Sequence, residues 1–208
     1  LMGAHRLVTL TGAGGIGKTR LAVALARELR PHFADGVWLA QFSPLADPKL
    51  VPAAVAAAVG LELGSEASVQ SVAQGLAGRR LLLVLDTCEH VIEIAASMAE
   101  AALGAGPELR ILATSRELLK AEGEWVYPVS PLAVPTADVE QGDFLEYGAI
   151  RLFLERARAV NPRFAPDRPL VELIAAVCRR LDGIPLAIEL AAARAPALGV
   201  EGLAARLR

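Results

Sequence analysis

The chain has 208 residues, of which 54% are hydrophobic and 4% aromatic, so it contains enough apolar mass for a sizeable core. Its 21 Lys and Arg residues and its 23 Asp and Glu residues leave a formal net charge of -2. This balance excludes the basic surface with which nucleic-acid-binding domains hold phosphates, so we expect no direct nucleic-acid binding by this stretch.

Apolar runs alternate with helical patterns through the first part of the chain, which is typical of a parallel sheet flanked by helices, the α/β class. The runs predict five strands, at Leu7–Thr11, Val37–Ala40, Leu81–Leu85, Leu109–Ala113 and Trp125–Tyr127. Between the first two strands, Leu21, Leu25 and Leu29 share one face of a predicted helix that ends near Pro31. Further helices are expected within residues 49–76, on both sides of Gly64-Ser65, and within residues 91–103.

The pattern changes after Pro131, where residues 135–142 have the composition of a linker and only helical spacing follows. We expect helices over residues 147–160, over a stretch that begins near Pro169, and from Pro185 onward. The sequence therefore predicts a sheet domain over residues 1–138 and a small helical domain over residues 139–208.

A glycine-rich segment, Gly12–Thr19, matches the pattern G-x-x-x-x-G-K-[ST] in full and lies between a predicted strand and a predicted helix. Glycines let backbone amides turn toward a phosphate, a lysine can bridge two phosphates, and a threonine hydroxyl can bind Mg²⁺. The segment predicts binding of ATP or ADP with Mg²⁺. The candidate nucleotide-binding residues are Gly12, Gly14, Gly15, Ile16, Gly17, Lys18, Thr19 and Arg20.

Asp86 ends the most apolar of the predicted strands. A carboxylate held rigidly at such a strand end can orient Mg²⁺ together with Thr19, although an isolated aspartate there is more often a turn or capping residue. Placed after a complete phosphate-binding segment, Asp86 is predicted to be a metal-binding and catalytic residue, and Lys18 is predicted to act with it.

Two further residues are candidates for a role in hydrolysis. Thr87 occupies the place after Asp86 where many ATPases of this type carry an acid, so Glu89 is the nearest candidate for a general base. The alternative is that Glu89 is only an acid favoured by the start of a helix. Arg116, which follows a predicted strand, either senses the terminal phosphate or is a solvated surface arginine.

Four segments together resemble the signal-transduction ATPases with numerous domains, and within them the NB-ARC-type module of AfsR-like and large LuxR-type bacterial regulators. The segments are Gly12–Thr19, Leu81–Asp86, Ile111–Arg116 and Gly183–Leu186. Without that context, the last segment is simply a helix break and restart. The resemblance implies a P-loop NTPase sheet with strand order 5-1-4-3-2, a sensor role for Arg116, and a contact between Pro185 and the nucleotide.

The resemblance also implies a function: ADP holds a resting state, ATP exchange permits self-assembly, and slow hydrolysis resets the module. The other domains of the same regulator would be its partners. Two departures from the family pattern are Ile184 in place of leucine and the non-acidic Thr87, and the second puts fast hydrolysis in question. A nucleotide-stabilised interaction module with negligible hydrolysis and a small-molecule kinase on the same loop are the competing interpretations.

The remaining features indicate a cytoplasmic protein. Cys88 and Cys178 have no companion cysteine or histidine at metal-binding spacing, so two buried free thiols are expected. No apolar run reaches the length needed to span a bilayer, and no secretory signal precedes the first strand.

Overall fold

The computed structural model describes residues 2–63, 67–136 and 144–207. It divides into two compact units, the first made of Leu1–Gly14 and Lys18–Val129 and the second of Gly15–Gly17 and Ser130–Arg208. Two sequence predictions, the domain boundary at residue 138 and the turn at Gly64-Ser65, lie outside the described residues.

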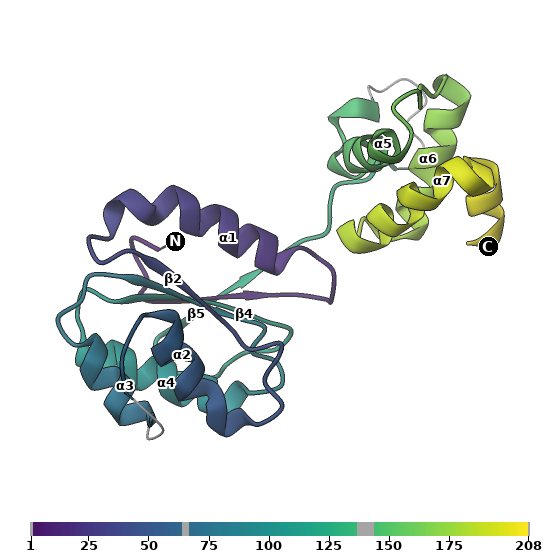
Figure 1. Ribbon diagram of the computed structural model, residues 1–208. Coiled ribbons are helices and arrows are strands. Elements are labelled where there is room, and N and C mark those ends of the chain that lie inside the picture. The colour runs from purple at the N-terminus through teal and green to yellow at the C-terminus, as the bar shows by residue number, and fades with distance from the viewer. Residues whose placement is uncertain (1, 64–66, 137–143, 208) are drawn as a thin grey trace. The chain divides into compact units, whose positions relative to one another are not determined.

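The first unit contains a five-stranded sheet in which every pair of neighbouring strands is parallel, in the order β2-β3-β4-β1-β5 (Figure 1). The strands are β1 (Leu7–Thr11), β2 (Val37–Gln41), β3 (Leu82–Asp86), β4 (Arg110–Ser115) and β5 (Glu124–Pro128). The same order, read from the other edge, is the predicted 5-1-4-3-2, so the expected α/β fold and strand order are confirmed.

The composition of each strand matches its place in the sheet. All five residues of β3 are buried, because this strand has neighbours on both sides and helices on both faces. The edge strands are more exposed: Trp38 and Leu39 of β2 and Trp125 and Tyr127 of β5 each keep more than a third of their surface in water. The uninterrupted apolar run that predicted a buried strand therefore belongs to the interior of the sheet.

Helices cover both faces of this sheet, with α1 on one side and α2, α3 and α4 on the other (Figure 1). Their bounds are α1 (Lys18–Leu29), α2 (Val51–Ala58), α3 (Val69–Leu76) and α4 (Ile92–Ala105), with single 3-10 turns at η1 (Arg30–His32) and η2 (Pro48–Leu50). The expected leucine face of α1 is only partly correct. Ala22 and Ala26 are its buried apolar residues, Leu25 and Leu29 are partly buried, and Leu21 is exposed. Small side chains let this helix lie close to the sheet.

The second unit is helical throughout its described elements. These are η4 (Phe144–Glu146), α5 (Gly148–Val160), α6 (Arg168–Arg180) and α7 (Pro185–Arg206), the last interrupted by non-helical backbone at Gly199. Its core is apolar and includes Phe153, Ile174 and Ile188, one from each long helix. The helix starts predicted near Pro169 and at Pro185 are confirmed, since a proline without an N–H fits the first turn of a helix.

Candidate functional site

The glycine-rich segment joins β1 to α1 and has the backbone that its sequence requires. Gly15 has a φ of 75° and Gly17 a φ of 101°, in the left-handed region where any other residue would be strained. The loop ends at Lys18, the first residue of α1. Its amides are therefore placed at the start of a helix, where an anion is favoured.

Lys18 lies within the loop and is only 9% exposed. Its Nζ donates hydrogen bonds to the backbone oxygens of Gly12, at 2.9 Å, and of Ala13, at 3.0 Å. Burial lowers the pKa of the Lys18 ammonium below its ordinary value, and the carboxylate of Glu89 is the strongest of the charges that oppose this effect. The loop thus holds a partly desolvated cation against its own carbonyl groups.

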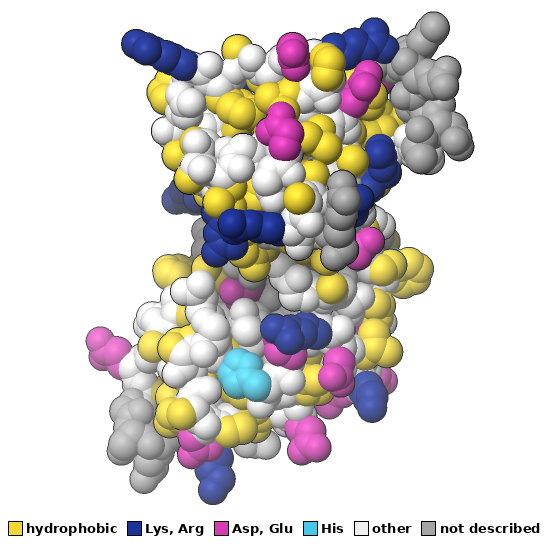
Figure 2. Space-filling view, turned by 90° about the vertical axis from the view of Figure 1, so that its right-hand side faces the viewer, with side chains coloured by type: hydrophobic (Ala, Val, Ile, Leu, Met, Phe, Trp, Pro, Cys, Tyr) yellow, Lys and Arg dark blue, Asp and Glu magenta, His cyan; other side chains and the backbone are white. Residues whose placement is uncertain are grey.

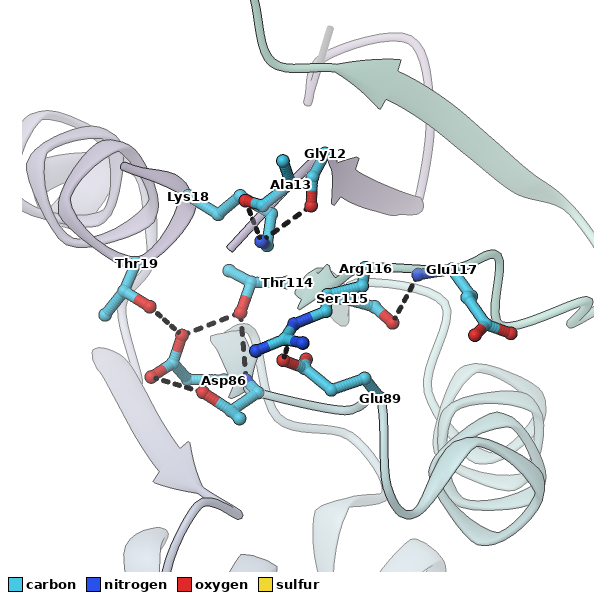
Figure 3. A network of polar contacts seen from close by, with 11 residues as sticks. Gly12, Ala13, Lys18, Thr19, Asp86, Glu89, Thr114, Ser115, Arg116 and Glu117 are labelled. Atoms are coloured by element: carbon cyan, nitrogen blue, oxygen red, sulfur yellow. Dashed lines mark hydrogen bonds and ion pairs between the residues drawn. The ribbon is translucent and has the colours of Figure 1, made fainter. Parts of the chain in front are cut away.

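Asp86 is the centre of a hydrogen-bond network at the carboxyl end of β3 (Figure 3). Its Oδ1 accepts hydrogen bonds from the Oγ1 of Thr19 and from the Oγ1 of Thr114, both at 2.7 Å. The Asp86 side chain is almost completely buried. Because β1, β3 and β4 are parallel, their carboxyl ends lie at the same end of the sheet. This arrangement brings residues of three separate segments together.

Thr114 was not among the candidate site residues, yet it ties two segments together. Its Oγ1 donates to Asp86 and accepts a hydrogen bond from the backbone N–H of Thr87, at 2.9 Å. The signal in the sequence was a polar residue near the end of an apolar strand. To use this signal, one must know that this strand lies next to the strand of Asp86.

Thr87, the non-acidic residue directly after Asp86, has an unusual backbone. Its φ is 65°, and a β-branched residue in the left-handed region is strained by about 1–3 kcal/mol. The surrounding hydrogen bonds hold it there: the amide of Thr87 bonds to Thr114, and that of Cys88 to the Thr114 carbonyl oxygen at 2.9 Å. The Oγ1 of Thr87 lies 3.5 Å from the Oδ2 of Asp86, so the residue beside this carboxylate adds no second charge.

Glu89 and Arg116, predicted separately, form an ion pair in which the Nε of Arg116 lies 3.1 Å from the Oε1 of Glu89 (Figure 3). Arg116 follows β4 and Glu89 lies in the turn between β3 and α4. The guanidinium also lies against the phosphate-loop backbone, since a Cβ added to Gly14 would be 3.4 Å from its Nη2. The carboxylate of Glu89 is therefore engaged by a cation rather than presented freely to solvent.

Three further candidate residues are Ile16, Arg20 and Pro185. Ile16 is buried, Arg20 lies on the exposed side of α1, and Pro185 begins α7 in the second unit. The roles predicted for these three residues toward a nucleotide stay predictions.

The glycine of the segment Gly183–Leu186 has a structural explanation within the second unit. Gly183 has a φ of 66°, and a side chain there would run into the backbone of Leu132. The amide of Leu132 donates a hydrogen bond to the Gly183 oxygen at 3.0 Å. The packing of this unit alone therefore requires glycine at that position.

Among the residues that the structure describes, no group of three or more His, Cys, Asp or Glu side chains is gathered to hold a metal ion. No helix in the same residues is long and apolar enough to cross a membrane. The face drawn in Figure 2 mixes acidic and basic side chains, in keeping with the small net charge. Both cysteines are free and buried, as predicted.

No family model matches the chain. It is similar to Rv0890c of Mycobacterium tuberculosis, whose name provisionally assigns it to the HTH-type transcriptional regulators; the two are 41% identical over 197 residues, which cover 93% of this chain and 21% of that protein. The uncharacterized protein Rv0894 of the same organism is 38% identical over 199 residues, 95% of this chain and 48% of that protein. The chain thus spans only part of the length of the curated relatives that it matches.

One solved structure supports the fold independently. It is the Signal Transduction ATPase with Numerous Domains protein with a tetratricopeptide repeat sensor from Pyrococcus horikoshii, with a TM-score of 0.52 and 16% sequence identity. The match covers 87% of this chain and 26% of that one. At this identity the likeness shows the fold alone and nothing about activity.

Proposed function

We propose that this chain is the ATP- and ADP-binding switch module of a signal-transduction ATPase, of the NB-ARC type found in bacterial transcriptional regulators, and that it acts in the cytoplasm. The observation that carries the proposal is the arrangement of side chains at the carboxyl ends of the parallel strands. Lys18 lies in a complete phosphate loop, and the Asp86 carboxylate joins Thr19 and Thr114 beside it. The name of the mycobacterial relative supports a regulatory role.

The residues present fit a nucleotide with Mg²⁺. The loop amides and Lys18 would hold the β-phosphate. The Lys18 ammonium donates to the loop carbonyl oxygens of Gly12 and Ala13, and a phosphate can replace these acceptors. The hydroxyl of Thr19 and the carboxylate of Asp86, already 2.7 Å apart, would hold the cation directly or through water. When bound, Mg²⁺ neutralises phosphate charge.

A switch requires that the two nucleotides favour different conformations of the protein. In the proposed scheme Arg116 distinguishes the triphosphate from the diphosphate, and Pro185 at the start of α7 contacts the nucleotide. ADP then favours a resting state, ATP permits self-assembly and contacts with the other domains of the regulator, and slow hydrolysis returns the module to rest.

Amide hydrogen exchange tests this scheme. The chain is compared in Mg-ADP and in Mg²⁺ with a non-hydrolysable ATP analogue, each at a saturating concentration. We expect the exchange rates at Gly183–Leu186 and around Arg116 to differ between the two nucleotides. Equal exchange at both places, with both nucleotides bound, would contradict a switch.

A second candidate, a nucleotide-stabilised interaction module with negligible hydrolysis, is favoured by two observations. Thr87 puts no carboxylate beside Asp86, and the nearest acid, Glu89, is paired with Arg116. Neither arrangement provides a free base for an attacking water. In a single-turnover experiment on ATP-loaded protein, phosphate release over minutes supports the switch, whereas none over hours supports this candidate.

A further inference from the structure

The guanidinium of Arg116 is paired with Glu89, and it lies at the place where the phosphates of a bound nucleotide are expected. Arg116 contacts Glu89 through its Nε (Figure 3). Its Nη2 lies close to Gly14 of the phosphate loop, 3.4 Å from where a Cβ on that glycine would be. Its side chain remains 63% exposed, so it is free to change conformation. The Arg116 guanidinium is thus within reach of both the Glu89 carboxylate and the phosphate loop.

Glu89 depends strongly on this partner. Its side chain is 23% exposed, and among the described residues its Oε2 has no hydrogen-bond partner although it is buried. A buried carboxylate oxygen without a donor is unfavourable, so the Glu89 charge is compensated chiefly through Oε1 by Arg116. Removing Arg116 would take away the cation that contacts this carboxylate directly.

We propose that Glu89 competes with the terminal phosphate of a nucleoside triphosphate for Arg116, and so weakens triphosphate binding relative to diphosphate binding. This inference rests on the proposed function. With a diphosphate, the pair between Glu89 and Arg116 stays intact. With a triphosphate, Arg116 turns to the additional phosphate, and the unfavourable separation from Glu89 reduces the affinity. Glu89 is then a specificity-determining residue that biases the site toward ADP.

Calorimetric titrations of the chain with Mg-ADP and with a non-hydrolysable ATP analogue test the proposal. Glu89→Gln keeps the shape of the side chain and removes the buried charge, so we expect it to fold. It should bind the analogue about three- to tenfold more tightly and change ADP affinity less than about twofold. Glu89→Ala should have the same effects as Glu89→Gln: tighter binding of the analogue and little change in ADP affinity. Glu93→Gln, at an exposed acid in the first turn of α4, is the matched control and should leave both affinities within about twofold.

The double variant identifies the mechanism. In an Arg116→Ala background, Glu89→Gln should no longer improve analogue binding, because no guanidinium is left to release. A full improvement in that background would overturn the competition and show simple repulsion between carboxylate and phosphate. An unchanged affinity ratio in Glu89→Gln, with slower phosphate release from ATP, would also overturn it and identify Glu89 as a base. If the unaltered chain bound neither nucleotide, the proposed function would fail together with this inference.

Discussion

The two units differ in what they bury. In the first unit, five buried side chains are polar or charged, whereas no polar or charged side chain among the described residues of the second unit is buried. The five are Thr9, Lys18, Asp86, Thr114 and Ser115. Burying polar groups is unfavourable unless they are hydrogen-bonded. Four of the five, all except Thr9, lie in the phosphate loop or at the carboxyl ends of β3 and β4, which indicates a binding site rather than a requirement of folding. The second unit is built as a packed body.

The largest effect is expected from a change in that packed body. Gly183→Ala forces a side chain against the Leu132 backbone at a positive φ, which should reduce the free energy of unfolding by about 2–5 kcal/mol. Gly202→Ala is the control, since the added Cβ would lie 3.8 Å from the Cβ of Leu198, an ordinary contact distance. This variant should be neutral or stabilising by up to about 1 kcal/mol. Chemical denaturation measures both. Equal stability of the two variants would contradict the close packing of Gly183.

Two buried threonines of the sheet differ in the hydrogen bonding of their hydroxyl groups. Thr114→Val removes a donor to Asp86 and the acceptor of the Thr87 amide, and should cost about 1–3 kcal/mol of stability. Thr9→Val makes the same change on β1, where the hydroxyl is buried and has no hydrogen-bond partner among the residues that the structure describes, so it should be neutral or stabilising. If Thr9→Val destabilised the protein as much, the network around Asp86 would have no special weight. Urea denaturation curves of both variants measure this difference.

Each unit carries one buried thiol, and both should make stability depend on alkaline pH. Burial raises the pKa of the Cys178 thiol to about 12 and raises that of Cys88 further, from an ordinary value of 9.0. Above about pH 9 the unfolded chain releases these protons while the folded chain retains them, so stability falls as pH rises.

The expected slope from each thiol is about 1.4 kcal/mol per pH unit once the unfolded thiol is ionised. Denaturation at a series of pH values between 8 and about 10.5 measures it. Cys178→Ala, compared with the unaltered chain, should remove one of the two contributions. Rapid alkylation of Cys88 and Cys178 in the native protein would contradict their burial.

The smallest effect is expected at Pro185. If this residue contacts the nucleotide, Pro185→Ala should weaken ADP binding about two- to fivefold through loss of apolar contact. Pro169→Ala makes the same change in the first turn of α6 and should leave ADP binding unchanged. Competition with a fluorescent ADP derivative has the precision required. Equal affinities in the two variants would remove Pro185 from the site.

The sequence was sufficient for the features that depend on neighbouring residues. Gly12–Thr19 and the buried β3 strand ending in Asp86 follow from local patterns, and the strand order followed from the family resemblance. Contacts between distant segments were not predictable in this way. The bonds of Asp86 to Thr19 and Thr114 join residues 67 and 28 positions apart, and their partners depend on which strands are neighbours.

The same limit explains the other differences. The pairing of Glu89 with Arg116 requires that β4 lie next to β3, and the left-handed backbone of Thr87 is held by hydrogen bonds that the amides of Thr87 and Cys88 donate to Thr114. On α1, the leucine spacing indicated an apolar face, but closeness to the sheet selected the alanines as its buried residues.

The most direct test of the account is a titration of the chain with ADP in the presence of Mg²⁺. We predict one bound nucleotide per chain, and a loss of affinity of about tenfold or more in Lys18→Ala, because a charge-assisted contact with phosphate is removed. Lys49→Ala, at an exposed lysine in η2, should bind ADP as the unaltered chain does. Absence of ADP binding, or equal binding by the Lys18 and Lys49 variants, would contradict the assignment of Gly12–Thr19 as a nucleotide site.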